Sequence, residues 1–143
     1  MKKIITIISC GLLLLAAGCK PKEEPVDPQK ALYGNVARPE WVAPEDYDYT
    51  SSMTAVISMD SLVTSSEDVL AAFIGDECRG IATYDSGLFY LYIAGPGETV
   101  TLRYWSAQYT NLFVAADAFP YSNDSQQGSY TAPFVPNLTV VTD

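Results

Sequence analysis

Any chemistry in this chain must proceed without histidine, because its 143 residues contain none. The most conspicuous reactive residue is Cys78, which follows the dipeptide Gly75-Asp76. Glycine followed by aspartate is typical of a two-residue hairpin turn of type II′, which would place Phe73 opposite Cys78 and point the thiol into the core. A buried thiol with no neighbouring base is not a nucleophile. We therefore expect Cys78 to be structural.

The same register places Arg79 on the other face of the hairpin, opposite Ala72. Arg79 and Arg103 are the only basic residues from Glu40 onward, where fourteen acidic residues give a net charge of −12. A cation in such surroundings is expected to be held by carboxylates, and Glu77 stands two residues away. The sequence thus favours a structural clamp at Arg79, with a ligand contact as the alternative.

A second group of residues combines aromatic rings with a cation. If residues 95–98 form a hairpin loop, strands 88–94 and 99–105 pair, and one of their faces is wholly apolar. The other face carries the candidate ligand-binding residues Tyr90, Tyr92, Arg103 and Trp105. Rings can stack on the C–H faces of sugars while a guanidinium donates to hydroxyls. The same pairs would also stabilise a sheet that binds nothing.

Acidic clusters raise the question of bound calcium, although no cofactor is expected. Hard oxygen ligands occur in Asp46 with Asp48, Glu67 with Asp68, Asp76 with Glu77, and the segment 122–128. None follows the EF-hand pattern, and these residue types are also ordinary turn formers. Without histidine or a metal cluster, only carboxylate pairs remain for acid-base catalysis. We expect no catalytic residues and no enzyme.

The elements that must position these residues are nearly all strands. Residues that favour strands are abundant, and no helical stripe exceeds two turns. The expected strands are 53–59, 69–74, 77–83, 88–94, 99–105, 112–115 and 134–141. Their spacing predicts an all-β fold, an antiparallel β-sandwich of about seven or eight strands, immunoglobulin-like or jelly-roll-like.

The N-terminal residues predict export. Two lysines precede the apolar run 4–15, and small residues 16–18 lead to Cys19. This run is a signal peptide rather than a membrane span, which needs about 20 apolar residues. The junction "LLAAGCK" resembles a bacterial lipobox, although Ala16 stands where leucine is more usual. The resemblance implies cleavage before Cys19 and its lipidation, which would anchor the chain to a membrane; an ordinary secretory signal is the alternative.

The chain then divides into a signal peptide (1–18), a disordered tether (19–39) and a β-sandwich domain (40–143). The tether is rich in proline and charge and too poor in apolar residues to fold. Its Lys22-Glu23-Glu24 resembles the short acidic signal that sends lipoproteins of the Bacteroides group to the cell exterior. That resemblance implies a lipid-anchored protein on the outer membrane, facing outward; a solvated spacer is the alternative.

Longer segments resemble a module that recurs in extracellular proteins of Bacteroides relatives. Its Ala-Phe-x-Gly-x-x-Cys-Arg-Gly hairpin corresponds to Ala72 to Gly80. Its upstream tryptophan and its closing Gly-x-x-x-x-Pro-Phe segment correspond to Trp41 and to Gly128 to Phe134. The resemblance covers most of the chain after about residue 40, and it implies a β-sandwich module of accessory or adhesion-like type without catalytic residues.

Charge and composition limit the classes of partner that we expect for this chain. A strongly acidic domain repels phosphate backbones and anionic headgroups, so nucleic acid is not expected. The expected function is a non-catalytic cell-surface lipoprotein module for adhesion, assembly or protein interaction. The alternative is a glycan-binding lipoprotein accessory to polysaccharide uptake. Exposed aromatic rings around Tyr90 would favour the glycan, whereas a covered face or a free sheet edge would favour a protein partner.

Overall fold

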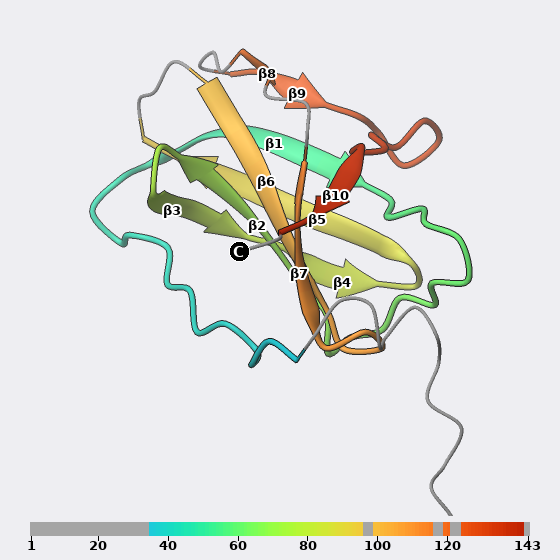
Figure 1. Ribbon diagram of the computed structural model, residues 1–143. Coiled ribbons are helices and arrows are strands. Elements are labelled where there is room, and N and C mark those ends of the chain that lie inside the picture. Colours follow the sequence, from blue (N-terminus) through green and yellow to red (C-terminus); the bar gives the residue numbers. More distant parts are fainter. Residues whose placement is uncertain (1–34, 96–98, 116–118, 121–123, 142–143) are drawn as a thin grey trace, which may run out of the picture.

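The computed structural model describes residues 35–95, 99–115, 119–120 and 124–141 (Figure 1). Every regular element in these ranges is a strand, so this part of the chain offers no helix that could cross a membrane. The strands are β1 (Tyr49–Ala55), β2 (Val69–Ile74), β3 (Glu77–Ile81), β4 (Thr83–Asp85), β5 (Leu88–Ala94), β6 (Thr99–Ser106), β7 (Asn111–Ala115), β8 (Phe119–Pro120), β9 (Gln126–Gln127) and β10 (Leu138–Val140). The predicted all-β class is confirmed.

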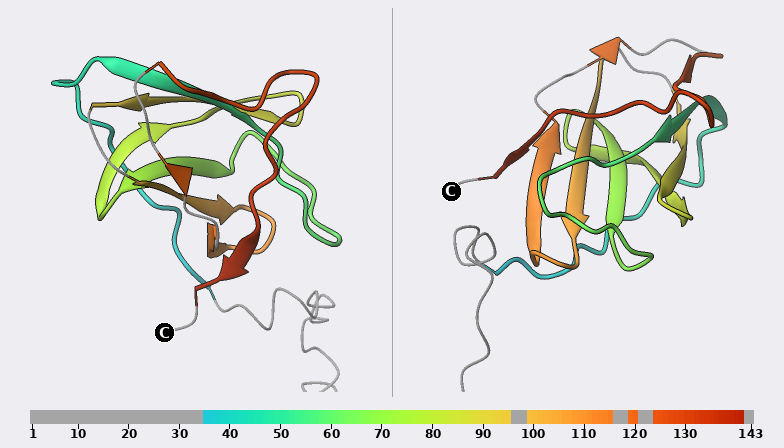
Figure 2. Two further views of the ribbon diagram at one scale, coloured as in Figure 1. Left: turned by 90° about the horizontal axis from the view of Figure 1, so that it is seen from above. Right: turned by 90° about the vertical axis from the view of Figure 1, so that its right-hand side faces the viewer.

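Two sheets face each other. Sheet A has the strand order β4-β5-β1-β9, and sheet B has the order β10-β7-β6-β2-β3, with β8 paired to β6. Neighbouring strands are antiparallel except β9, which runs parallel to β1. Figure 2 shows β1 and β5 on one side of the molecule and β6 and β7 on the other. The molecule is therefore the antiparallel β-sandwich that the sequence predicts.

The core lies between the sheets and is built from alternate residues of the longer strands, as the two-residue period of a strand requires. Its buried members from sheet A are Met53, Ala55, Phe89, Leu91 and Ile93. Its members from sheet B include Leu70, Ala72, Val100, Leu102, Tyr104, Phe113 and Ala115. Each of these residues alternates along its strand with one that points away from the core.

The strands β2 and β3 form the predicted hairpin. Gly75 has φ +62°, while Asp76 has no positive φ, which is the pattern of a II′ turn, and Phe73 pairs with Cys78. Beyond that pair the predicted register is wrong, because Ala72 lies opposite Gly80 rather than Arg79. Arg79 is the extra residue of a β-bulge, which bends the strand and redirects its side chain.

The predicted pairing of β5 with β6 is wrong. β5 pairs with β1 and β4 in sheet A, whereas β6 pairs with β2 and β7 in sheet B. The chain therefore crosses from one sheet to the other between Gly95 and Thr99. The predicted inward residues are nonetheless the buried ones, because two strands that face each other across a core present the same alternation as two strands that pair side by side.

Three predicted strands differ from the observed ones by more than one residue at an end. The first strand lies at Tyr49–Ala55 rather than 53–59, and the last is shortened to Leu138–Val140. The predicted strand 77–83 is split into β3 and β4, which belong to different sheets. At this corner Gly80 lies against the backbone carbonyl of Tyr92, and an added Cβ would clash with that oxygen. The close approach of the two sheets here thus requires glycine.

A segment before β1 covers the outer side of sheet B. It runs from the turn between β6 and β7 along the β3 side of the sheet to the start of β1 (Figure 1). The backbone N–H of Val36 donates to the carbonyl of Thr110 over 2.7 Å, and Arg38 Nε donates to the carbonyl of Glu67 over 3.1 Å. Residues 35–39, which the sequence assigns to the tether, are therefore attached to the domain.

Candidate functional site

The four candidate ligand-binding residues do not share a face. Tyr90 and Tyr92 belong to β5 and point outward from sheet A, whereas Arg103 and Trp105 belong to β6 and lie on the outer side of sheet B. The single platform predicted from the sequence is therefore wrong. Its two halves have different surroundings.

On sheet B, Trp105 and Arg103 are in contact with other parts of the same chain. Trp105 is only 5% exposed, and its indole N–H donates to the carbonyl of Val36 over 2.9 Å. The Arg103 guanidinium lies 3.9 Å from the ring centre of Phe73 and is paired with Asp76 over 3.2 Å. These residues hold the N-terminal segment and the hairpin turn in place, so this side of β6 does not form the predicted sugar platform.

Cys78 lies beneath the same segment. It forms a small cluster with Ala71 and Phe73, and the ring of Trp41 packs edge-on against Phe73 with 5.2 Å between centroids. The prediction that the thiol is buried beside Phe73 is confirmed, but the cluster lies on the outer side of sheet B rather than in the core between the sheets. Burial raises the pKa of Cys78 above its ordinary value of 9.0. The thiol is therefore protonated at neutral pH and is a poor nucleophile.

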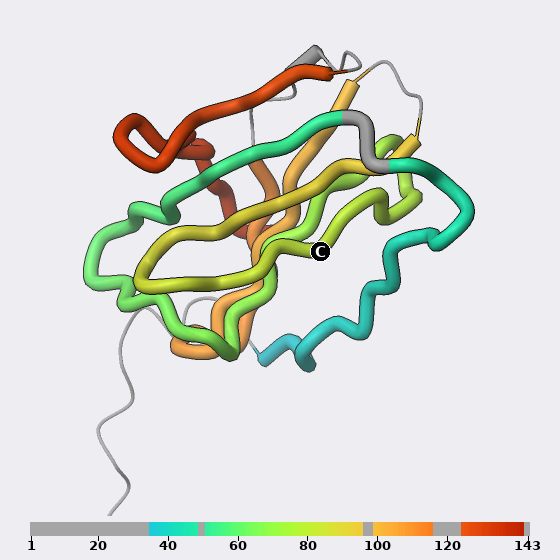
Figure 3. The backbone as a smooth tube through the Cα atoms, turned by 180° about the vertical axis from the view of Figure 1, so that it is seen from behind, coloured from blue at the N-terminus to red at the C-terminus, as the bar shows by residue number. Residues whose placement is uncertain are grey.

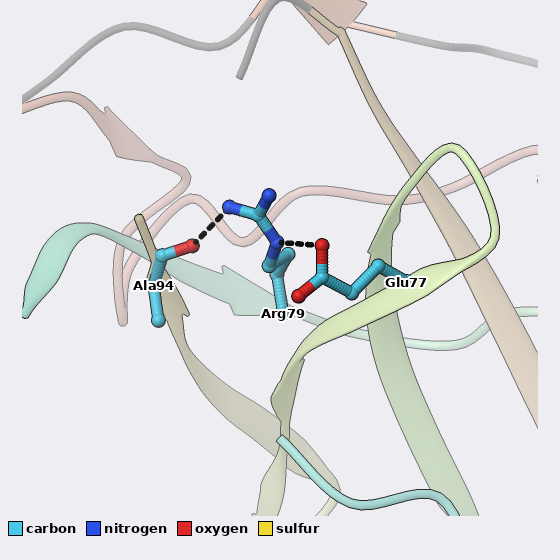
Figure 4. Close-up of polar contacts among 3 residues, drawn as sticks. All are labelled: Glu77, Arg79 and Ala94. Atoms are coloured by element: carbon cyan, nitrogen blue, oxygen red, sulfur yellow. Dashed lines mark hydrogen bonds and ion pairs between the residues drawn. The ribbon is translucent and has the colours of Figure 1, made fainter. Parts of the chain in front are cut away.

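Arg79 forms the expected clamp (Figure 4). Its Nε lies 3.0 Å from Oε2 of Glu77, as the sequence predicts, and its Nη1 donates to the carbonyl of Ala94 over 3.1 Å. Its guanidinium also lies 4.5 Å from the ring centre of Tyr47. Since Ala94 belongs to β5 and Arg79 to β3, the side chain ties the edge of sheet B to sheet A.

Asp68 is buried and has several hydrogen-bond donors around its carboxylate. Its Oδ2 accepts from the hydroxyl of Tyr104 over 2.6 Å and from the backbone N–H of Ser65 over 3.0 Å, and its Oδ1 accepts from the N–H of Ala107 over 2.9 Å. Burial and this carboxylate both raise the pKa of Tyr104. The carboxylate thus fixes the loop before β2 to the end of β6.

The acidic clusters considered for calcium are arranged differently from a metal site. In the described ranges, no three His, Cys, Asp or Glu side chains come together in a geometry that could hold a metal ion. Asp68 accepts a hydrogen bond from Tyr104. Asp76 forms an ion pair with Arg103, and Glu77 forms one with Arg79. Part of the segment 122–128 lies outside the described residues.

The half of the predicted platform on sheet A has neighbours that sequence reasoning missed. Tyr92 pairs with Ser52 of β1, and Ser52 in turn pairs with Gln126 of β9. Tyr90 pairs with Thr54 of β1 on one side and with Thr83 of β4 on the other. Paired residues point to the same side of a sheet. We call this group the hydroxyl face, and it consists of Ser52, Thr54, Thr83, Tyr90, Tyr92 and Gln126.

The six residues of the hydroxyl face carry no charge, and half of them are exposed. Figure 3 shows sheet A from its outer side, with β1, β5 and β4 side by side and β6 crossing behind them. The side chain of Tyr92 is 62% exposed, and Thr83 and Gln126 are also exposed. The polar partners were missed because alternation identifies which residues of a strand point outward but does not identify which strands are neighbours.

The hydroxyl face brings two aromatic rings, hydroxyl groups and an amide together on the outer side of sheet A. Comparisons with protein-family models, curated proteins and solved structures find no match for this chain.

Proposed function

We propose that this chain is a non-catalytic binding module displayed on a bacterial cell surface by a lipid on Cys19, and that it contacts its partner through the hydroxyl face. The observation that carries the proposal is the exposure of Tyr92 on the outer side of sheet A, with hydroxyl groups on the neighbouring strands. An exposed aromatic ring beside hydroxyl groups is a recurrent feature of contact surfaces, because tyrosine offers apolar area at a low cost in side-chain entropy.

The state of the other reactive groups supports a non-catalytic role. The Cys78 thiol is buried with a raised pKa, and the Asp68 carboxylate is engaged by hydrogen bonds that fix a loop. The guanidinium of Arg79 joins the two sheets. Groups that hold the fold together in this way lack the open approach that a nucleophile or general acid needs.

Display on the cell surface is inferred from the N-terminal sequence. The lipobox-like junction at Cys19, the short acidic signal after it and the resemblance to extracellular Bacteroides modules all support a lipid-anchored protein that faces outward. The tether would then hold the sandwich away from the bilayer.

The proposal is tested with the full-length protein on intact cells. The variant Tyr92→Cys should react with a membrane-impermeant maleimide, while the wild-type protein should stay unlabelled because Cys78 is buried. If Tyr92→Cys reacts only after the cells are broken, the protein is not displayed outward, and this part of the proposal is wrong.

Contact through the hydroxyl face is tested by attachment of these cells to plates coated with neutral polysaccharides or with matrix proteins. Tyr92→Ser should abolish the attachment shown by the wild type. Val42→Ser is the matched control, because Val42 is 79% exposed and follows Trp41 on the side of sheet B. Equal attachment of Tyr92→Ser and the wild type would contradict the assignment of this face.

A further inference from the structure

We propose that the hydroxyl face binds a neutral polysaccharide, laid across the strands of sheet A with a sugar ring stacked on Tyr92. This inference rests on the proposed function and names the chemical class of the partner. It differs from the platform expected from the sequence, because it uses no cation and draws its polar groups from β1, β4 and β9.

The tyrosine rings of the hydroxyl face stand on a rigid strand. β5 is hydrogen-bonded to β1 and β4, so the backbone that carries Tyr90 and Tyr92 is held on both sides. A ring presented by a rigid strand loses little conformational entropy when a ligand stacks on it. Tyrosine also combines an apolar ring with a hydroxyl, and sugars present both C–H surfaces and hydroxyl groups.

The polar side chains of the hydroxyl face have unused hydrogen-bonding capacity. Within the described residues, the side chains of Ser52, Thr54, Thr83 and Gln126 take no part in a hydrogen bond. A hydroxyl can both donate and accept, and a carboxamide carries one group of each kind. The face therefore offers donors and acceptors around the ring, which is the capacity needed to match the mixed donors and acceptors of a polyol.

The charge of sheet A and of the domain favours an uncharged ligand. In the four described strands of sheet A, the one charged residue is Asp85, an acid at the end of β4 that lies on the same side of the sheet as Thr83. The domain as a whole is strongly acidic, so a sulfated, phosphorylated or uronic-acid polymer would be repelled. An uncharged chain meets no such repulsion, and it leaves no buried ion without a partner.

The width of sheet A favours a ligand that extends across several strands. The first and last strands of sheet A are separated by three strand spacings, or about 14 Å. Polar side chains that extend across this width suit an extended polymer rather than a small end group. A protein partner that added a strand would instead dock on a sheet edge through backbone groups and would not need the hydroxyl face.

The test uses the full-length protein in detergent and native gels cast with a single polysaccharide. The neutral probes are dextran, laminarin, mannan, xylan and galactan, and polygalacturonate is the anionic comparison. At least one neutral probe should retard the wild type, and polygalacturonate should not. Tyr92→Ala should weaken the retarding interaction about tenfold, as loss of a central aromatic contact does. Tyr92→Phe should retain most of it, because the ring remains.

Two controls separate binding from folding. Tyr92→Ala should keep the thermal midpoint of the wild type, since its ring is largely exposed in the free protein. Val42→Ser should bind as the wild type does. Thr83→Val should weaken retardation by less than Tyr92→Ala, because it removes one hydroxyl and keeps the shape.

Each contrary result has a distinct meaning. If none of the neutral probes retards the wild type, or if polygalacturonate binds as well as they do, the glycan inference is wrong. If Tyr92→Ala binds a neutral probe with wild-type affinity, the glycan site is elsewhere and this inference is also wrong. Failure here combined with Tyr92-dependent attachment to a protein coat would leave the proposed binding module intact and make its partner a protein.

Discussion

Single side chains in this protein have roles set by what surrounds them. Arg79 and Arg103 have the same chemistry and similar carboxylate partners, yet Arg79 is buried and joins two sheets while Arg103 pairs with a fully exposed Asp76. An exposed pair is screened by water and contributes little to stability. The bridging hydrogen bond of Arg79 is the more important of the two for the fold.

The buried hydroxyl of Tyr104 gives a prediction for stability. Tyr104→Phe removes the hydrogen bond to Asp68 and leaves a buried carboxylate with one donor fewer. The free energy of unfolding at pH 7 should fall by about 2 kcal/mol, as expected for a hydrogen bond to a charged group. Urea denaturation measures the loss. Tyr90→Phe is the control, because its hydroxyl makes no such bond, and it should keep wild-type stability.

The same residue predicts how stability depends on pH. The pKa values of Cys78 and Tyr104 are raised by burial above their ordinary values of 9.0 and 10.0. Above these values the unfolded chain releases protons that the folded chain retains, so the stability from both groups is complete below about pH 9 and is lost as the pH rises. Thermal midpoints between pH 8 and 11 should decline, and the decline should be shallower in Tyr104→Phe. An identical slope in both proteins would contradict this origin.

At the scale of elements, the β2-β3 hairpin combines a turn set by local sequence with a bulge set by its surroundings. Gly75 takes a positive φ because the two-residue turn demands it. The bulge at Arg79 places the guanidinium within reach of the Ala94 carbonyl and the Tyr47 ring. Only the first of these features follows from the amino acids of the hairpin alone.

The turn gives a second prediction. An added Cβ at Gly75 meets no atom within 4 Å, so a substitution there is penalised by backbone conformation alone. Gly75→Val should lower the free energy of unfolding by more than about 1 kcal/mol, because a β-branched residue is strained at positive φ. Gly75→Asn should lose less, since asparagine tolerates this region. Equal stability of the two variants in urea would show that the turn is not strained.

At the scale of the whole molecule, one side of the sandwich is closed and the other is open. The segment before β1 lies over the outer side of sheet B and covers Trp105 and the Cys78 cluster. Figure 3 shows the strands of sheet A from the opposite side, where Tyr92, Thr83 and Gln126 of the hydroxyl face are exposed. If the chain is tethered through Cys19, as we propose, the N-terminal segment and the proposed binding surface lie on different sheets.

The anchor is the prediction at this scale. Cys19 lies outside the described residues, so its lipidation rests on the sequence. Cys19→Ser should move the protein from the membrane fraction to the soluble fraction, because the acyl chains supply the membrane affinity. Fractionation and the intact mass of the purified chain measure the change. A wild-type mass without acyl chains, or membrane association that persists in the variant, would show that Cys19 is not the anchor.

The sequence by itself determined the strand character of the domain, the turn at Gly75 and which residues of β5 and β6 point into the core between the sheets. These features depend on side chains close together in the chain, since alternation has a period of two residues whatever the partner strand is. The tertiary structure alone decided that β5 and β6 lie in different sheets, and that Val36 covers Trp105 from 69 residues away. It also brought Ser52, Thr83 and Gln126 beside the tyrosines. Strand pairing depends on packing between distant segments, and no local pattern encodes it.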